Sequence, residues 1–492
     1  MVGAGMGGLA VAARLAAQGH QVHVVEQLET YGGKVQRFER DGFVFDTGPS
    51  LLTLPAVYRD LFLKTATRKK DARLEDNVDL QGLETAFAYR WADGARAQLP
   101  GAGVNKVCLA LGDGLGGSAA DQWSAFSRRA ADIWEASRVD FLERPLTKRD
   151  LVRYSRRVSD LRTVAPWRNL RGLGRQYLSD PRLVTLLDRY ATYSGSDPRK
   201  APAALAVIPY VEQTFGAWHV GGGMRELARA VFERCEQRGV TFSFSTEVSR
   251  IVVDGGRVSG VEVDGGRRLP ADLVVTDADA STVYTSLVDD PRAKQPLRDL
   301  RRATPSFSGF VMLLAVDGRT PGVQHHNVWF PQDYDAEFDA VFGARPAVDP
   351  TVYACVPDDP AMRPDENSES WFVLVNAPRH DPGHGTDWSD QQLVGSYAER
   401  VLDVLASRGV DLRPRLRWRE VVTPEQIGRS TRSPGGSIYG TSSNGARSAF
   451  LRPANRSPVT GLFLVGGSAH PGGGLPLVGM GAAIVAEQVG SA

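Results

Sequence analysis

The sequence opens with a glycine-rich motif that few folds can use. Residues 3–8 read GAGMGG, so Gly3, Gly5 and Gly8 match the spacing GxGxxG. LAVAARLAAQG then predicts a helix of small residues, and QVHVVEQ alternates as a strand does and delivers Glu26. Such glycines allow a tight turn and bring backbone N–H groups close to a pyrophosphate at a helix N-terminus. The opening therefore predicts a Rossmann-type nucleotide-binding unit.

The acid and the short leader refine this prediction. Glu26 stands where a carboxylate binds ribose hydroxyls and repels a 2′-phosphate, which favours FAD or NAD over NADP. Only Met1 and Val2 precede the glycine turn, although a strand of about five residues normally leads into it. We therefore expect a longer form of the chain to carry an apolar strand upstream.

A second glycine loop follows the acid. TYGGKVQ places Gly32 and Gly33 where a loop approaches the same pyrophosphate, and Lys34 adds a positive charge. FVFDTGPSLL then supplies Gly48 and Pro49 as further candidates for cofactor contact. These loops strengthen the assignment, because GxGxxG alone is a weak signal.

Other chemistries find little support in the composition. Cys108, Cys235 and Cys355 form no CxxC pair, and the neighbouring His325 and His326 lack the spacing of HExxH, so we expect no metal site. With 58 Lys+Arg against 57 Asp+Glu, no global charge draws the chain to nucleic acid. GDGLGG at 112–117 also matches GxGxxG, but no strand ending in an acid follows, and we interpret it as an ordinary loop.

The C-terminal segment is the second glycine-rich signal. GLFLVGG at 461–467 predicts a buried strand, and GLPLVGMGAAIVAEQV at 474–489 predicts a helix of small residues. The N-terminus of such a helix directs N–H groups at an electron-rich oxygen of a flavin ring. Gly467, Val478 and Gly479 are the candidates for this contact.

Together these motifs resemble those of the flavoprotein amine oxidase and phytoene desaturase superfamily. The order GxGxxG, acid, GG[RK] is similar to its FAD fingerprint, with Lys34 where arginine is usual. SAHPGGGLPLV resembles the phytoene desaturase ending, with Ser468 and Ala469 in place of a Gly-Thr pair and with His470 matching. The resemblance implies FAD as the cofactor and a backbone contact between Val248 and adenine. Further similar stretches are GGGM at 221–224, HHNVWF at 325–330 and NGARSAFLRPANRSP at 444–458.

The resemblance implies an α/β fold with a discontinuous Rossmann-type FAD-binding domain and an inserted mixed α+β substrate domain. We expect largely helical structure over 51–219, and 128–175 hold thirteen basic and six acidic residues. Those charges predict either a solvated helical face or a surface that rests on anionic lipid. The expected segments are 1–60, 218–290 and 431–492 for the FAD-binding domain, and 61–217 and 291–430 for the substrate domain.

The resemblance further implies FAD-dependent desaturation of a carotenoid, either phytoene or a later C40 intermediate that includes hydroxylated ones. A polyene has no polar group that a protein could bind, so the reaction needs an apolar tunnel that holds the polyene in line with the flavin. His470 is the candidate for a catalytic role, with a purely structural role as the alternative. Because only one dinucleotide motif is credible, we expect quinone or dioxygen as electron acceptor.

Apolar runs such as VMLLAV at 311–316 are too short to span a bilayer, so we expect a cytoplasmic protein, peripheral on the membrane. Three other functions remain open: a redox-neutral carotenoid isomerase, an amine or porphyrinogen oxidase, and a non-enzymatic prenyl-lipid carrier of related fold.

Overall fold

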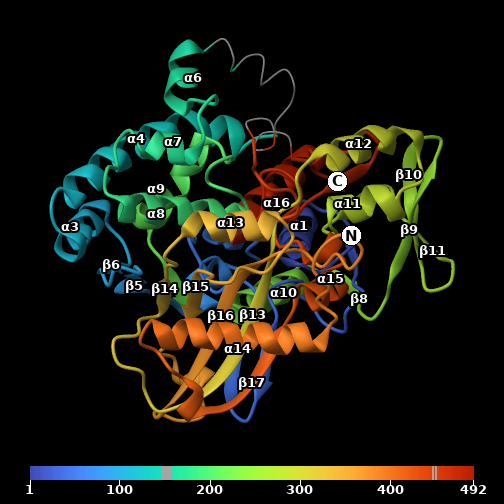
Figure 1. Ribbon diagram of the computed structural model, residues 1–492. Helices are drawn as coiled ribbons and strands as arrows, with labels where there is room; N and C mark the ends of the chain where they lie inside the picture. The colour runs from blue at the N-terminus through green and yellow to red at the C-terminus, as the bar shows by residue number, and fades with distance from the viewer. Residues whose placement is uncertain (146–153, 155–156, 446–447, 449–451) are drawn as a thin grey trace.

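The computed structural model describes the chain apart from residues 146–153, 155–156, 446–447 and 449–451 (Figure 1). Two sheets organise it. A parallel sheet holds the glycine turn, and a seven-stranded mixed sheet forms the second body, with a helical lobe beside it. The expected α/β class and discontinuous nucleotide-binding unit are confirmed.

The parallel sheet is built from segments that are far apart in sequence. Val2 lies between two of its strands: its N–H donates to the Val275 carbonyl at 2.9 Å, and the Gly3 N–H donates to the Val25 carbonyl at 2.8 Å. Met1 and Val2 thus pair on both sides, at the position of the strand that leads into a Rossmann glycine turn. In spatial order the strands are β8 (Thr241–Ser243), β1 (His23–Val25), then Val2, β12 (Val274–Thr276) and β18 (Leu462–Leu464).

Helices from both ends of the chain pack together beside this sheet. Small residues let helix α1 lie close to its neighbours, since Leu9 to Ala13 are all fully buried. The last helix, α16, packs along α1, and α10 contacts α1 as well. The predicted helices at both termini are therefore confirmed, and they lie side by side. Their bounds are α1 (Met6–Ala17), α2 (Ala56–Lys64), α10 (Arg225–Gln237) and α16 (Leu475–Val489).

Two smaller β units flank the nucleotide-binding unit. The short strands expected after residue 240 form an antiparallel three-stranded arm, which projects to the side in Figure 1. A hairpin precedes the loop that contains Gly48. The arm consists of β9 (Val248–Asp254), β10 (Arg257–Val263) and β11 (Arg267–Pro270), and the hairpin of β2 (Arg37–Arg40) and β3 (Phe43–Asp46).

The seven-stranded sheet carries the second core. Helix α14 (Gln391–Ser407) lies across one face and buries Tyr397, Val401 and Leu405 against it (Figure 1). The order is β17 (Leu416–Val422), β13 (Ser308–Asp317), β16 (Ser368–Ala377), β15 (Val352–Cys355), β14 (His326–Trp329), β5 (Thr85–Arg90) and β6 (Arg96–Pro100).

The expectation of largely helical structure over 51–219 is wrong for residues 80–100. Strands β5 and β6 lie there, and β4 (Leu80–Gly82) pairs with β7 (Trp218–Val220). Four consecutive residues of β5 are buried, so its sequence does not alternate as a half-exposed strand does. The parallel pairing of β5 with β14 explains this, because it places β5 inside the sheet.

The helical lobe lies above the sheets in Figure 1. GDGLGG is a loop only in part. Gly112 and Gly114 are inside α3, where Gly114 lets the helix approach β6 closely, whereas Gly116 and Gly117 lie in the turn that follows. The basic stretch 128–175 falls partly outside the described residues. The lobe contains α3 (Val104–Leu115), α4 (Ala119–Phe141), α6 (Val158–Val164), α7 (Leu170–Gly174), α8 (Pro181–Arg189) and α9 (Val207–Phe215). The remaining longer helices are α12 (Lys294–Arg302), α13 (Tyr334–Phe342) and α15 (Pro424–Thr431).

Candidate functional site

A cavity of about 870 Å³ extends from the glycine turn into the space between the helical lobe and the seven-stranded sheet. Two of the sequence-predicted residues, Gly8 and Gly479, do not line it. The predicted residues that the cavity brings together are Gly3, Gly5, Glu26, Gly32, Gly33, Lys34, Gly48, Pro49, Val248, Gly467, His470 and Val478. The N-terminal and C-terminal motifs therefore share one site.

The glycine turn is shaped by close backbone approaches. Gly3 has φ +92°, a conformation that favours glycine, and Gly5 is the N-cap of α1. A Cβ on Gly8 would overlap the Gly3 carbonyl oxygen, so Gly8 permits the contact between turn and helix. The second loop reaches the first, since a Cβ on Gly33 would lie 2.9 Å from the Gly5 Cα. The cradle left by these glycines fits a pyrophosphate at the helix N-terminus.

Glu26 is held by the backbone around the turn. Its carboxylate accepts the Ala4 N–H at 2.7 Å and the Leu28 N–H at 2.9 Å, and the residue is only 7% exposed. These bonds orient the carboxylate in the cavity wall directly after β1. The position matches that expected for a ribose ligand, and its role in binding ribose stays a prediction.

Lys34 lines the cavity, and its contact with the pyrophosphate stays a prediction. Its Nζ donates to the Ile438 carbonyl at 3.2 Å. Burial lowers the pKa of the ammonium group, and the nearby charges of Asp279 and Asp277 oppose that effect. A Cβ on Gly48 would overlap the Lys34 carbonyl oxygen, so Gly48 allows the two loops to pack. The side chain thus links the second loop to the C-terminal part of the chain.

Sequence reasoning missed Asp277, which follows strand β12. Its carboxylate lies against the glycine cradle, with Oδ1 2.7 Å from where a Cβ on Gly7 would be. Burial is the main reason why its pKa is raised to about 7; the charge of Glu26 acts in the same direction, and the Gly8 N–H and Lys34 act in the opposite direction. No motif marks this residue, since an acid after a strand is common.

The C-terminal helix contributes its first turn to the cavity. Gly474 is the N-cap of α16, and Gly467 and Val478 line the cavity as predicted. Gly479 instead faces α2, because a Cβ there would lie 2.6 Å from Val57 Cγ1. It serves helix packing in this arrangement.

His470 is 7% exposed and lies in the cavity wall. Its Nε2 is 3.0 Å from the Arg144 carbonyl oxygen, which accepts a hydrogen bond from that nitrogen. Burial lowers the pKa of the imidazole, and the hydrogen bond to Arg144 opposes this effect. The ring is therefore neutral at pH 7, with the proton on Nε2 and Nδ1 left as an acceptor.

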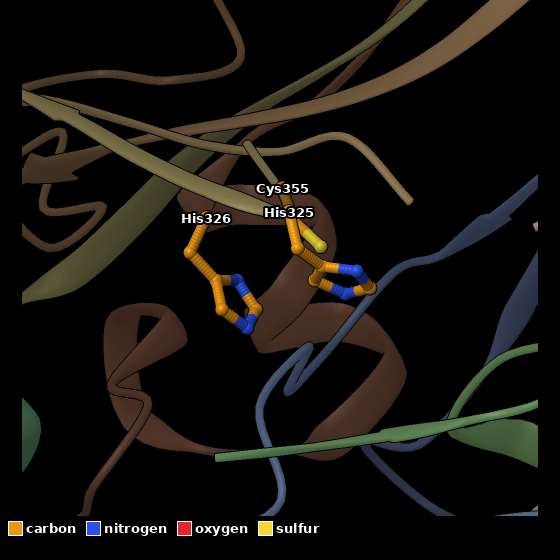
Figure 2. A group of neighbouring side chains, drawn as sticks. All are labelled: His325, His326 and Cys355. Carbon is orange, nitrogen blue, oxygen red and sulfur yellow. The ribbon is translucent and has the colours of Figure 1, made fainter. Parts of the chain in front are cut away.

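His325, His326 and Cys355 lie next to one another at β14 and β15 (Figure 2). Their potential ligand atoms lie within 4.8 Å of one another, whereas donors on one zinc ion stand roughly 3.5 Å apart. Burial lowers the pKa of His325 to about 3 and that of His326 well below its usual range, so both rings are neutral. His326 Nδ1 shares a hydrogen bond of 2.8 Å with Tyr353 Oη. The three side chains are thus neighbours that could hold a metal ion, and the absence of a metal site stays a prediction.

The chain is similar to proteins of known family along its whole length. Residues 6–476 match the family model of flavin containing amine oxidoreductases. It is 32% identical to a 4,4'-diapolycopene oxygenase of Methylomonas sp, over 99% of this chain and 97% of that protein. It is 31% identical to a 1-hydroxycarotenoid 3,4-desaturase of Flavobacterium sp. (strain P99-3), over 99% and 98% of the two chains. With the hydroxyneurosporene desaturase of Rubrivivax gelatinosus it shares 33% identity, over 99% and 92%.

Solved structures of low sequence identity share the fold. An oxidoreductase from Methanosarcina mazei aligns over 99% of both chains with a TM-score of 0.63 at 17% identity. A redesigned putrescine oxidase aligns over 99% of this chain and 97% of its own, with a TM-score of 0.62 at 16% identity. The glycine cradle, Glu26 and the first turn of α16 fit the dinucleotide and the flavin ring, and the cofactor is FAD. The chain belongs to the family of flavin-containing amine oxidoreductases.

Proposed function

We propose that this chain is an FAD-dependent carotenoid desaturase that removes hydrogen from a CH–CH group of a polyene. FAD, when bound, supplies a two-electron acceptor for that hydrogen. The observation that carries the proposal is the cavity, which continues from the FAD cradle into apolar side chains such as Ile208, Val211 and Leu374. The relatives named as carotenoid desaturases support the same substrate class.

The chain itself contributes binding and exclusion of water. Apolar residues of α9 and of the seven-stranded sheet surround the space beside the first turn of α16. Such apolar walls fix the position of a rigid polyene, so its reacting carbons remain at one place relative to the cofactor. The division into an FAD-binding domain and a substrate-binding domain, with the segments given above, is part of this proposal.

Anaerobic incubation of the holoenzyme with carotenoids in liposomes tests the function. We expect the polyene absorbance to move to longer wavelength and the product to lose two hydrogens per step. An isomerase leaves the product mass unchanged, and a lipid carrier leaves both mass and absorbance unchanged. Unchanged absorbance with phytoene, neurosporene and hydroxylated analogues contradicts the proposal.

We further propose His470 as the group that accepts a proton through Nδ1. Because the pKa of the buried ring lies below 6.5, the acceptor is available above that pH and is lost as the pH falls. We expect His470→Gln to lower kcat by roughly 100-fold and to remove the acidic limb of the pH profile. FAD content is the control. A variant with unchanged kcat and an unchanged profile leaves His470 with a structural role.

Asp277 gives FAD binding a dependence on pH. Its carboxyl, with a pKa of about 7, is neutral at pH 6 and negative at pH 8.5, next to the pyrophosphate cradle. Since like charges repel, we expect the Kd of the apoprotein for FAD to rise about tenfold across this range. Asp277→Asn is expected to remove the dependence, and the exposed cap variant Asp390→Asn to keep it. A pH-independent Kd in the unchanged protein would refute this expectation.

We propose that the protein works on a membrane surface and passes electrons to quinone or dioxygen. No helix in the described part of the chain is both long and apolar enough to cross a bilayer. Trp167 and Phe215 are large exposed apolar residues of the helical lobe, at 64% and 42% exposure. Each Lys or Arg close to an anionic leaflet contributes about 1 kcal/mol to the free energy of membrane binding. We expect cosedimentation with phosphatidylserine vesicles that falls with added salt, and not with neutral vesicles.

A further inference from the structure

A polar cluster interrupts the apolar wall of the cavity. Arg189, at the end of α8, donates from Nη1 to Tyr193 Oη at 2.7 Å. Tyr193 in turn donates to Glu212 Oε2 at 2.9 Å, and Tyr190 donates to Glu212 Oε1 at 2.7 Å. Arg189 is 6% exposed and Glu212 4%, and both line the cavity together with Tyr193. Charged residues in such a setting call for a specific reason, because burying them is costly.

Aromatic rings stabilise the positive charge of the Arg189 guanidinium, but most of its N–H groups make no hydrogen bond to the described residues. The rings of Phe87, Tyr89, Tyr193 and Tyr353 lie 5.1–5.7 Å from its central carbon. A guanidinium has five N–H donors, and within the described residues the bond to Tyr193 is the one hydrogen bond that it makes. Because Arg189 lines the cavity, donors that have no partner among the described residues are available to a ligand.

The cluster also lies close to the cofactor loop. Tyr353, whose ring Arg189 approaches, shares a hydrogen bond of 2.6 Å with Ser50, the residue after Pro49. Gly48 and Pro49 belong to the loop predicted to contact FAD, and they line the same cavity. A ligand group bound at Arg189 is therefore close to the loop that is predicted to contact FAD.

We infer that Arg189 and Glu212 form a subsite for a hydroxyl group on the end of the carotenoid. This inference rests on the proposed function and specifies its substrate class. A hydroxyl both accepts and donates, so the guanidinium donates a hydrogen bond to its oxygen while the Glu212 carboxylate accepts a hydrogen bond from its O–H. A pure hydrocarbon end would leave the buried donors unpaired, which costs binding energy. The subsite places the double bond that forms close to the hydroxylated end.

A matched pair of substrates tests the subsite in the holoenzyme. One is a carotenoid with a tertiary hydroxyl at its end, and the other is the same hydrocarbon without it. We expect kcat/KM to favour the hydroxylated substrate by roughly 10- to 100-fold, as expected for a charged hydrogen-bond donor left unpaired. Arg189→Met is expected to reduce this ratio to near one. Arg182→Met, which removes an arginine from the same helix but outside the cavity, is expected to keep the ratio.

Each outcome separates the two proposals. Activity on neither substrate contradicts the desaturase function itself. Equal kcat/KM for both substrates in the unchanged protein, or an equal loss on both in Arg189→Met, overturns the subsite while the function stands. If Arg189→Met does not retain FAD, Glu212→Gln provides the second test, because an amide of the same shape keeps an oxygen acceptor for one tyrosine, presents its NH2 to the hydroxyl oxygen of the other, and removes the charge. In that variant the ratio is again expected to fall, and an unchanged ratio overturns the inference.

Discussion

Gly8→Ala is expected to cost the protein its flavin. The added methyl group overlaps the Gly3 carbonyl oxygen. Neither residue can easily move away, because the parallel sheet and α1 hold the backbones of residues 3 and 8 in place. Overpacking of this kind costs about 1–3 kcal/mol, which corresponds to roughly 10- to 100-fold weaker FAD binding if the turn moves instead. The measurement is the flavin absorbance per protein after purification, followed by titration of the apoprotein with FAD.

Gly395→Ala is the matched control for this variant. Gly395 also lies inside a helix, α14, but an added Cβ there meets nothing within 4 Å. Because alanine favours a helix over glycine by about 0.5–1 kcal/mol, we expect unchanged flavin content and an equal or higher Tm. Full flavin content in Gly8→Ala would contradict the close approach of turn and helix.

Ile208→Trp is expected to block the polyene and to spare the cofactor. Ile208 is in α9 and lines the cavity with Leu205 and Val211, away from the glycine turn. A rigid polyene has no bend that avoids an indole in its path, and a displacement of about 1 Å costs on the order of 100-fold in rate. We expect kcat/KM to fall by about that factor, with unchanged flavin absorbance.

The exposed variant Val348→Trp controls for the added indole. Val348 is 74% exposed and does not line the cavity, so its activity is expected to equal that of the unchanged protein. A lower activity in both variants, or undiminished activity in Ile208→Trp, shows that the polyene takes another route. Loss of FAD in Ile208→Trp would indicate a folding defect, and the smaller Ile208→Phe then repeats the test.

The glycine turn and the loop beside it were predictable, because the spacing of glycines indicates where the backbone turns tightly. Gly3, Gly5, Gly32 and Gly33 lie in a turn and loop that meet, as their spacing predicts. Gly479 does not line the cavity, since position along a helix does not say which side faces a cavity, and its contact with the flavin stays a prediction. Strand β5 was missed because burial on both faces removes the alternation that a strand normally shows.

The remaining site residues depend on tertiary contacts that carry no local signal. Asp277 and Arg189 follow ordinary patterns for a strand end and a helix end, and only the folded chain shows that both face the cavity. The proximity of Cys355 to His325 and His326 arises from the pairing of β14 with β15. Of the stretch at 444–458 that supported the resemblance, residues 446–447 and 449–451 lie outside the described residues.

The parallel sheet has a consequence for biosynthesis. Strand β18 and helix α16 are translated after the other elements of this sheet and its helices, yet they complete the sheet beside β12 and close the packing around α1. A nascent polypeptide from which residues 462–489 have not yet emerged therefore has the first glycine turn but not these later partners. Stable incorporation of the prosthetic group is expected only after that segment has folded, and a chain without riboflavin-derived cofactor is expected to lack the stabilisation that a bound ligand gives.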